Sequence, residues 1–326
     1  MREITYVDAL NEAHHEEMDR DARVIVMGED VELAYVFGVT KGLAKKFGRD
    51  RVRDTPISEL GIVGTGVGAA MAGSRPVVEI MFMDFIMLAM DPLVNQAAKL
   101  RYMVGGQLNV PLVVRTPGGG GVQYGPTHSQ CLEAWFMQVP GLKVAVPSDP
   151  VDAKGMLKAA IRDDDPVLFV EHKMLYKTKG PVPDGDHVVP LGTGVVKREG
   201  RDITLIGIGY QVVNCLRAAD ELEKEGICAE VVDPRSLAPL DTAILAASVR
   251  KTARCVVVEE GHLRSGVGAE ISAAVQEEAF DYLDAPVGRV ASLEAPIPFE
   301  PKLEEFVLPS VGSIVKAAKQ ALGVPV

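Results

Sequence analysis

The first segment whose side chains could do chemistry is the glycine-rich stretch from Ile57 to Gly73. Near its start is Glu59, which stands between Ser58 and the apolar Leu60. A carboxylate at the start of an apolar helix commonly acts only through the helix dipole. A carboxylate with little water around it can instead have a raised pKa and hold or donate a proton. The sequence leaves both interpretations of Glu59 open.

The glycines of this stretch do not favour a nicotinamide site. Gly64, Gly66 and Gly68 are spaced G-x-G-x-G, whereas the dinucleotide fingerprint needs G-x-G-x-x-G directly after an apolar strand. The preceding residues, Arg51 to Pro56, are too polar for that strand. We therefore expect a small-residue helix that packs closely against another backbone or lets a ligand approach.

A second segment runs from four consecutive glycines, Gly118 to Gly121, to His128. The glycines follow a predicted strand, Pro111 to Arg115, and a helix is expected to begin near Ser129. Ligands of open α/β sheets gather at the carboxyl ends of strands, so His128 would lie over such a crevice. The alternative is a polar turn that caps the helix and has no catalytic role.

A third segment contains Glu29 and Asp30, which directly follow the first predicted strand, Arg23 to Met27. These acids could cap the next helix or face a ligand. The residues alone favour neither interpretation.

Apolar runs without clean alternation, separated by helical spacing, predict mostly parallel sheets covered by helices on both faces. The strand candidates are Arg23–Met27, Val77–Phe82, Pro111–Arg115, Leu142–Val146, Val167–Val170, Ile203–Ile208, Cys228–Val232 and Arg254–Val258. The helix candidates are Ile86–Met103, Asp149–Arg162, Val213–Lys224 and Ala269–Phe280. Turn formers dominate Lys177 to Asp186. We predict an α/β protein with two domains, residues 1–180 and 201–326, joined by a linker at 181–200.

The composition excludes several classes of function. A net charge of -11 argues against nucleic-acid binding, which needs basic patches. The N-terminal residues do not resemble a signal peptide, and no apolar run approaches the ~20 residues that span a bilayer. The four cysteines lack metal-ligand spacing and are expected to be core residues in a reducing compartment. We expect a cytoplasmic protein without a membrane segment.

Several segments of the sequence, taken together, form a pattern that is specific to one protein family. They are Gly28–Asp30, Asp54–Glu59, Gly73–Pro76, Asn95–Tyr102, Gly125–Gln130, Ala160–Pro166 and Val232–Leu240. In this order they resemble the beta subunit of the thiamine-dependent component of 2-oxo acid dehydrogenases, a family that includes pyruvate, branched-chain and acetoin dehydrogenases. The resemblance runs nearly from end to end of the chain.

The resemblance implies a pyrimidine-binding, transketolase-like first domain, a transketolase C-terminal-like second domain and an alpha2beta2 heterotetramer with an alpha subunit. It assigns Glu59 as the cofactor-activating glutamate. Its carboxyl group would bond the aminopyrimidine ring of thiamine diphosphate and favour the tautomer that generates the nucleophilic ylid. His128 would assist acyl transfer to a lipoyl group, and Glu29 would lie beside the cofactor.

The resemblance also implies two sets of contact residues. The aminopyrimidine pocket would be lined by Ile57, Ser58, Met81, Phe85 and Leu88. A structural monovalent cation such as potassium would be held by Leu112, Ala160, Ile161, Asp163 and Asp165. A plain acidic turn explains Asp163 to Asp165 equally well.

The sequence lacks the Gly-Asp-Gly motif with which thiamine enzymes hold magnesium and the diphosphate. The resemblance therefore implies that the alpha partner holds the magnesium and that the active sites form at alpha–beta interfaces. It further implies docking onto a lipoyl acyltransferase core, through the lipoyl and subunit-binding domains of that core. Asp281 to Asp284 and Val326 are candidate contacts.

The expected reaction is cleavage of pyruvate, a branched-chain 2-oxo acid or acetoin, followed by acyl transfer to a lipoyl domain. Leu88 stands where pyruvate-using relatives often have a polar residue, and Glu171 to Gly180 resembles acetoin dehydrogenases, so the substrate stays open. The alternative is a non-catalytic assembly or regulatory subunit of the same fold. The presence of both Glu59 and His128 argues against that alternative.

Overall fold

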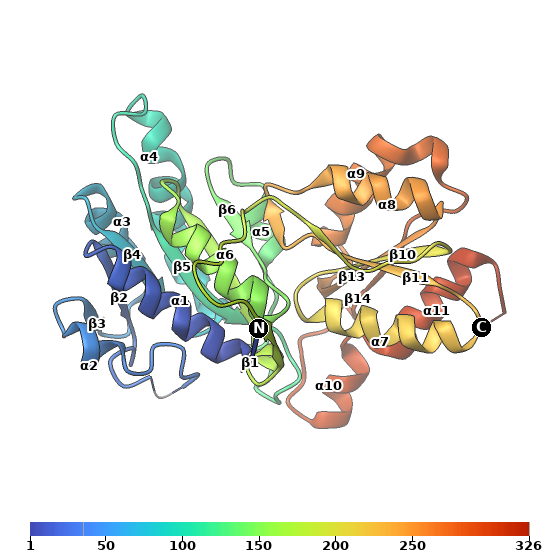
Figure 1. The fold of residues 1–326 in the computed structure, drawn as a ribbon, viewed down its shortest axis with the longest axis horizontal. Helices are drawn as coiled ribbons and strands as arrows, with labels where there is room; N and C mark the ends of the chain where they lie inside the picture. Colours follow the sequence, from blue (N-terminus) through green and yellow to red (C-terminus); the bar gives the residue numbers. More distant parts are fainter. Residues whose placement is uncertain (35, 326) are drawn as a thin grey trace. The chain divides into compact units, whose positions relative to one another are not determined.

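The computed structural model describes residues 1–34 and 36–325. The chain forms two compact units (Figure 1), of which unit 1 comprises Met1–Gly118 and Trp135–Leu191 and unit 2 comprises Gly119–Ala134 and Gly192–Val326. Each unit contains a mostly parallel sheet with helices on its faces, which confirms the predicted α/β fold. Val326, considered above as a docking contact, lies outside the described residues.

Unit 1 is centred on a parallel sheet in which the strands lie in the order β6-β7-β5-β4-β2-β3. Apolar runs form its inner strands, and every residue of β5 and β7 is buried, as expected for strands covered on both faces. The strands are β2 Val24–Gly28, β3 Val52–Asp54, β4 Arg75–Glu79, β5 Val113–Gly118, β6 Lys143–Ala145 and β7 Val167–His172. A separate antiparallel pair consists of β1 Arg2–Thr5 and β8 Lys179–Val182.

Two helical segments of unit 1 test the sequence-based predictions. Helix α6 begins as predicted, because the Asp149 carboxylate accepts the Asp152 N–H at 2.9 Å and Pro150 occupies the first turn. The segment Ile86–Met103, predicted as one helix, instead passes from a 3-10 turn through a π turn to a short α-helix, and Pro92 lacks the N–H that a continuous helix would need. The helical elements are α1 Tyr6–Arg20, α2 Leu43–Phe47, α3 Glu59–Met71, η1 Met83–Ala89, η2 Asp91–Ala97, α4 Ala98–Met103, α6 Pro150–Arg162 and η3 Lys173–Leu175.

Unit 2 is built on a five-stranded sheet in the order β14-β13-β10-β11-β9, in which only β9 is antiparallel to its neighbour. Helices α8 and α9 cover one face, and α7 and α11 cover the other (Figure 1). The strands are β9 Val195–Arg198, β10 Ile203–Gly207, β11 Ala229–Asp233, β13 Cys255–His262 and β14 Gly288–Ser292, with the short β12 Ser236–Ala238 outside this sheet. The helical elements are α7 Tyr210–Lys224, α8 Thr242–Thr252, α9 Val267–Ala279, η4 Phe280–Tyr282, α10 Pro301–Val307 and α11 Val311–Leu322.

The segment Gly119–Ala134 belongs to unit 2, whereas the sequence-based boundaries place it in the first domain. Backbone N–H groups of its glycine run bind carboxylates of unit 2: Gly120 donates to Glu260 at 2.6 Å and Gly121 donates to Glu304 at 2.8 Å. Such contacts leave no periodic signal in the sequence. The predicted linker at 181–200 contains the second passage of the chain from unit 1 to unit 2, and it stays a prediction.

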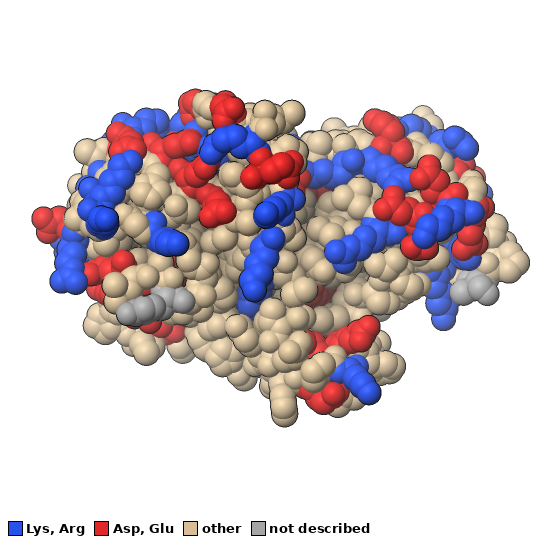
Figure 2. Space-filling view, turned by 60° about the horizontal axis from the view of Figure 1, so that its bottom comes forward, with Lys and Arg blue, Asp and Glu red and all other residues tan. Residues whose placement is uncertain are grey.

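The helix expected near Ser129 begins later, since α5 spans Glu133–Met137. Acidic and basic side chains are intermixed on the face of each unit drawn in Figure 2. Arg198, for example, pairs with both Asp220 and Glu223. Among the described residues, no helix combines the length and the apolar character needed to span a bilayer.

Two glycines of α3 should respond oppositely to substitution by alanine. A Cβ at Gly66 would lie 2.8 Å from Val78 Cγ1 and 3.0 Å from Leu112 Cδ1, whereas a Cβ at Gly68 would meet nothing within 4 Å. We expect Gly66→Ala to destabilise the chain by about 1–3 kcal/mol through overpacking. Gly68→Ala should stabilise it by about 0.5–1 kcal/mol, because alanine is the better helix former. Urea unfolding of the full chain would measure both, and equal effects at the two positions would contradict this packing.

Candidate active site

The carboxyl ends of β2 and β4 bring acidic residues to one edge of the unit 1 sheet. Strand β2 ends at Gly28, which Glu29 follows directly, and Gly28 is the register partner of Glu79 at the end of β4. The Thr55 N–H donates to the Gly28 carbonyl at 2.9 Å, so the chain that leads to Glu59 passes the same edge. This is the edge at which parallel sheets bind ligands.

Glu59 is the first residue of α3 and is only 5% exposed. The residues near it in the sequence are much more accessible to solvent, since Ile57 is 81% exposed and Leu60 is also exposed. A helix N-terminus attracts a negative charge, and little water reaches this side chain. Glu59 therefore has both features that were weighed from the sequence, a helix-terminal position and shelter from water.

Glu29 lies close enough to Glu59 for the two carboxyl groups to interact. Burial raises the pKa of Glu29, and the carboxylates of Glu59, Asp30 and Glu79 raise it further. Glu29 consequently keeps its proton to a higher pH than an ordinary glutamate. The structure thus brings together the two acids that the sequence presented in separate segments.

The residues predicted to line an aminopyrimidine pocket fall at the start of α3, on η1, which packs against α3, and just before η1. Ile57 and Ser58 immediately precede the helix and are exposed. Met81 and Phe85 are half-buried, and Leu88 is 63% exposed. Accessible apolar side chains beside a buried carboxylate suit an aromatic ring that carries one basic nitrogen. The residues therefore fit the aminopyrimidine end of thiamine diphosphate.

His128 lies in the segment of unit 2 that contains the glycine run. Its N–H donates to the Gly125 carbonyl at 3.3 Å, and its Nδ1 is 3.1 Å from the Thr127 hydroxyl. The side chain is half-buried in this turn. The two predicted catalytic residues thus belong to different units, Glu59 to unit 1 and His128 to unit 2.

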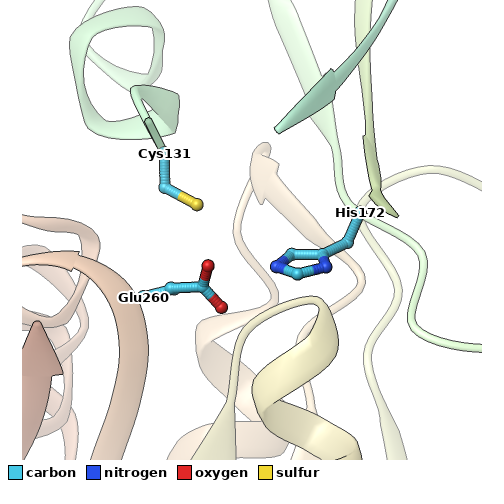
Figure 3. Close-up of side chains that lie close together, drawn as sticks. All are labelled: Cys131, His172 and Glu260. Atoms are coloured by element: carbon cyan, nitrogen blue, oxygen red, sulfur yellow. The ribbon is translucent and has the colours of Figure 1, made fainter. Parts of the chain in front are cut away.

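A cavity of about 440 Å³ in unit 2 is lined in part by residues on both sides of His128. Cys131 and Glu260 also line it, and Figure 3 shows the thiol and the carboxylate directed toward the same space. The Glu260 carboxylate accepts the Gly120 N–H at 2.6 Å and the Gln211 side-chain amide at 2.8 Å. Sequence reasoning did not single out Glu260, because only the fold brings it to the glycine run.

Glu133 is a second acid in unit 2 that sequence reasoning missed. It is buried, and burial raises its pKa to about 7, with the carboxylates of Glu260 and Glu259 acting in the same direction. Its sequence neighbours, Leu132 and Ala134, carry no signal of this environment.

Asp163 and Asp165, two of the residues predicted to hold a monovalent cation, lie in the turn after α6 and pair with the chain's own cations. The Lys143 ammonium donates to both carboxylate oxygens of Asp163, at 2.8 and 2.7 Å, and lies 3.3 Å from Asp165. The Arg75 guanidinium donates to the Asp163 carbonyl at 2.9 Å. The other predicted ligands of the cation are the backbone carbonyls of Leu112, Ala160 and Ile161. Each of these carbonyls also accepts a hydrogen bond from the chain. These contacts favour the acidic-turn explanation, and the potassium site stays a prediction.

A buried ionic network adjoins the edge that carries Glu29. Arg115, on β5, is 1% exposed and donates to Glu79 at 2.7 Å and to Glu171 at 2.6 Å. The Tyr176 hydroxyl donates to the other oxygen of Glu171 at 2.7 Å. The sequence placed Arg115 at the end of a strand and gave no sign of this network.

Two protein-family models match the chain. The transketolase pyrimidine-binding domain matches residues 2–179, and the transketolase C-terminal domain matches residues 192–314. A solved structure described as split gene transketolase, inactive beta4 tetramer, superposes with a TM-score of 0.79 over 98% of this chain and 99% of that chain. Its sequence identity of 24% extends the likeness to the fold alone.

Curated relatives are considerably more similar in sequence. The pyruvate dehydrogenase E1 component subunit beta-1 (mitochondrial) of Arabidopsis thaliana is 50% identical, over 98% of this chain and 90% of that protein. The acetoin:2,6-dichlorophenolindophenol oxidoreductase subunit beta of Bacillus subtilis is 46% identical, over 99% of this chain and 98% of that protein. The pyruvate dehydrogenase E1 component subunit beta of Rhizobium meliloti is also 46% identical, over 98% of this chain and 70% of that protein.

Proposed function

The chain belongs to the family of beta subunits of the E1 component of pyruvate and acetoin dehydrogenases, and from that premise we propose how it works with an alpha subunit. The complex cleaves a 2-oxo acid or acetoin with thiamine diphosphate and passes the acyl group to a lipoyl domain. The observation that carries the proposal is Glu59, a buried carboxylate at a helix N-terminus that acts electrostatically on Glu29 and follows the exposed apolar Ile57 in the chain.

Thiamine diphosphate, when bound, supplies the nucleophilic carbon that attacks the substrate carbonyl. The protein's part is proton control and orientation. Glu59 would bind the aminopyrimidine ring nitrogen and hold or move its proton, and the apolar Ile57 and Leu88 would shield the ring from water. His128 assists the transfer of the acyl group. A non-catalytic subunit would have no use for a buried carboxylate with a second acid near it at this edge.

Magnesium and the diphosphate are assigned to the alpha subunit, because this chain has no Gly-Asp-Gly motif. The assembly is an alpha2beta2 heterotetramer. Large apolar side chains that stand exposed on unit 1 support such a partner, since exposed apolar surface commonly marks an interaction site. They include Ile57, Leu60, Met71, Leu88 and Tyr102.

Pyruvate and acetoin are the proposed substrates, because relatives named for each are similarly close to this chain. The test is substrate-dependent reduction of an artificial electron acceptor by the assembled alpha–beta complex, with thiamine diphosphate and magnesium. Pyruvate, branched-chain 2-oxo acids and acetoin would be supplied in turn. Turnover on pyruvate or acetoin supports the proposal; turnover on none of them would favour the non-catalytic alternative. The cytoplasmic location stays a prediction.

Docking onto the lipoyl acyltransferase core is proposed to involve the acids around η4. Asp281 and Asp284 are exposed, next to the exposed Phe280 and Tyr282, and Asp284 also pairs with Arg254 at 3.1 Å. Acidic side chains around exposed aromatic ones suit a basic partner surface.

Neutralising Asp281→Asn and Asp284→Asn together should weaken binding of the core's subunit-binding domain by roughly ten-fold, since surface charge pairs contribute about 0.2–1 kcal/mol each. Calorimetric titration of the complex would measure the affinity. Asp220→Asn, which removes an exposed acid of α7, is the control. Unchanged affinity in the double variant would rule out this docking surface.

A further inference from the structure

Residues Gly119–Gln130 form a loop, the His128 loop, that is closed on itself and lies against helix α10. The Gly119 N–H donates to the Gln130 carbonyl at 3.3 Å, which brings the two ends of the loop together. His128 ends a turn within this loop, because its N–H donates to the Gly125 carbonyl. Loop and helix both belong to unit 2. A side chain on a loop is placed only as well as the contacts that hold the loop backbone.

Glu304, on α10, binds the first part of the His128 loop. One of its carboxylate oxygens accepts the Gly121 N–H at 2.8 Å, and the other accepts the Gln123 N–H at 3.1 Å. Glu304 is only 2% exposed, so little water competes for these contacts. Gln123 has a φ of 58°, a conformation that a residue other than glycine keeps only when its surroundings stabilise it. The two N–H groups thus form an anion-binding concavity that the chain's own carboxylate fills.

The ends of α10 contact the same loop at two more points. A Cβ at Gly120 would lie 3.0 Å from Cδ1 of Leu308, which directly follows the helix. A Cβ at Gly125 would lie 3.5 Å from Cβ of Phe299, which precedes the helix. Because Gly125 supplies the carbonyl that binds the His128 N–H, the second contact reaches the turn that carries the imidazole. The helix therefore supports the loop along its first half.

Helix α10 is itself fixed at both ends. The Glu300 carboxylate caps its start by accepting the Leu303 N–H at 2.9 Å. At its end, the Val307 carbonyl accepts the Leu293 N–H at 3.0 Å. Glu304 consequently projects from a secured element, as a side chain that positions a loop must.

We propose that Glu304 is a positioning residue that holds the His128 loop in the conformation in which His128 assists acyl transfer. The inference rests on the proposed function, which gives His128 that role. Glu304 acts through the backbone of the loop and is not itself a catalytic residue. Glu260, which accepts the Gly120 N–H at 2.6 Å, is a second anchor of the same part of the loop.

Acyl transfer and reduction of an artificial acceptor differ in what they need from His128. In acyl transfer a bond forms between the acyl carbon and one sulfur of the lipoyl disulfide, the S–S bond breaks, and the other sulfur leaves with the electron pair and takes up a proton. A well-placed acid such as His128 accelerates that step. Reduction of dichlorophenolindophenol opens no disulfide. Misplacement of His128 should therefore slow acyl transfer and spare the reduction of the dye.

The experiment compares Glu304→Gln with Glu305→Gln in the reconstituted alpha–beta complex. Glutamine keeps one acceptor oxygen but turns an NH2 group toward the second N–H, whereas Glu305 is an exposed acid of the same helix and serves as the control. In Glu304→Gln, kcat for acylation of a free lipoyl domain should fall by about 10–100-fold, and dye reduction should stay within about two-fold of the wild type. Glu305→Gln should change neither rate. An equal loss in both reactions, which a merely structural role predicts, or no loss of acyl transfer overturns the inference.

Glu304→Asp is a milder variant for the same comparison. It keeps the buried carboxylate but draws it back from the two N–H groups by one methylene, about 1.5 Å. It should show the same selective loss of acyl transfer, to a smaller extent than the glutamine variant. Wild-type acyl transfer in Glu304→Asp overturns the inference even when the Glu304→Gln complex fails to assemble.

A further readout does not depend on turnover. Diethyl pyrocarbonate modifies accessible imidazoles, and mass spectrometry of the full chain gives the rate at each histidine. His128 and His187 are both half-buried, but His187 lies in unit 1 and is the internal control. The rate at His128 should rise several-fold in Glu304→Gln, and the rate at His187 should not change.

An unchanged rate at His128, or an equal rise at both histidines, overturns the inference even when the complex turns over its substrate. A selective rise at His128 supports the inference even when the wild-type complex turns over none of the proposed substrates, a result that would sink the proposed function alone.

Discussion

Replacing Glu59 by glutamine is expected to lower kcat of the alpha–beta complex by about 10²–10⁴-fold, the range in which a positioned acid–base group contributes. Glutamine has nearly the same shape but cannot exchange a proton with the ring nitrogen. Thiamine diphosphate should still bind, because Ile57, Leu88 and the partner remain. The measurement is steady-state turnover of the assembled complex at saturating cofactor.

The control for this variant is Glu270→Gln, which removes an exposed acid from the first turn of α9. It loses the same kind of helix-dipole interaction but lies in unit 2, outside the acid pair. If Glu59 acts only through the dipole, both variants should lose stability by about 0.3–1 kcal/mol and keep their activity. That outcome would contradict the catalytic assignment.

The strands were largely predictable because burial on both faces demands apolar runs. The run at Val167–Val170 became the core of β7, and that at Ile203–Ile208 became β10. The position of Asp149 as a helix cap was predictable for a similar reason, since its interaction is local in sequence. Such local rules operate within a few residues and need no knowledge of the fold.

Other parts of the site depend on contacts between distant segments. Glu79, Arg115 and Glu171 meet only because β4, β5 and β7 are neighbours in the sheet. The burial of Glu59 results from the packing of α3, which its own sequence did not determine. For the same reason the glycine run near His128 could be placed only after the carboxylates that bind it in unit 2 were known.

The second large effect is expected when the alpha subunit is removed or added, and it concerns both cofactor binding and turnover. Purified alone, this chain should bind thiamine diphosphate weakly and show no turnover, because in the proposed site it supplies the aminopyrimidine end but no Gly-Asp-Gly motif for the diphosphate and magnesium. Addition of the alpha subunit should restore tight binding and activity together. The effect should be larger than that of any single substitution, since the proposed contacts to the diphosphate and magnesium are all absent without the partner.

The most direct measurement is therefore reduction of dichlorophenolindophenol with pyruvate or acetoin, by this chain alone and after reconstitution with the alpha subunit. Thiamine diphosphate and magnesium are present in both cases. The account predicts turnover only in the reconstituted complex, in proportion to the alpha subunit added until the two chains are equimolar. Robust turnover by the isolated chain, or none from a properly assembled complex, would contradict it.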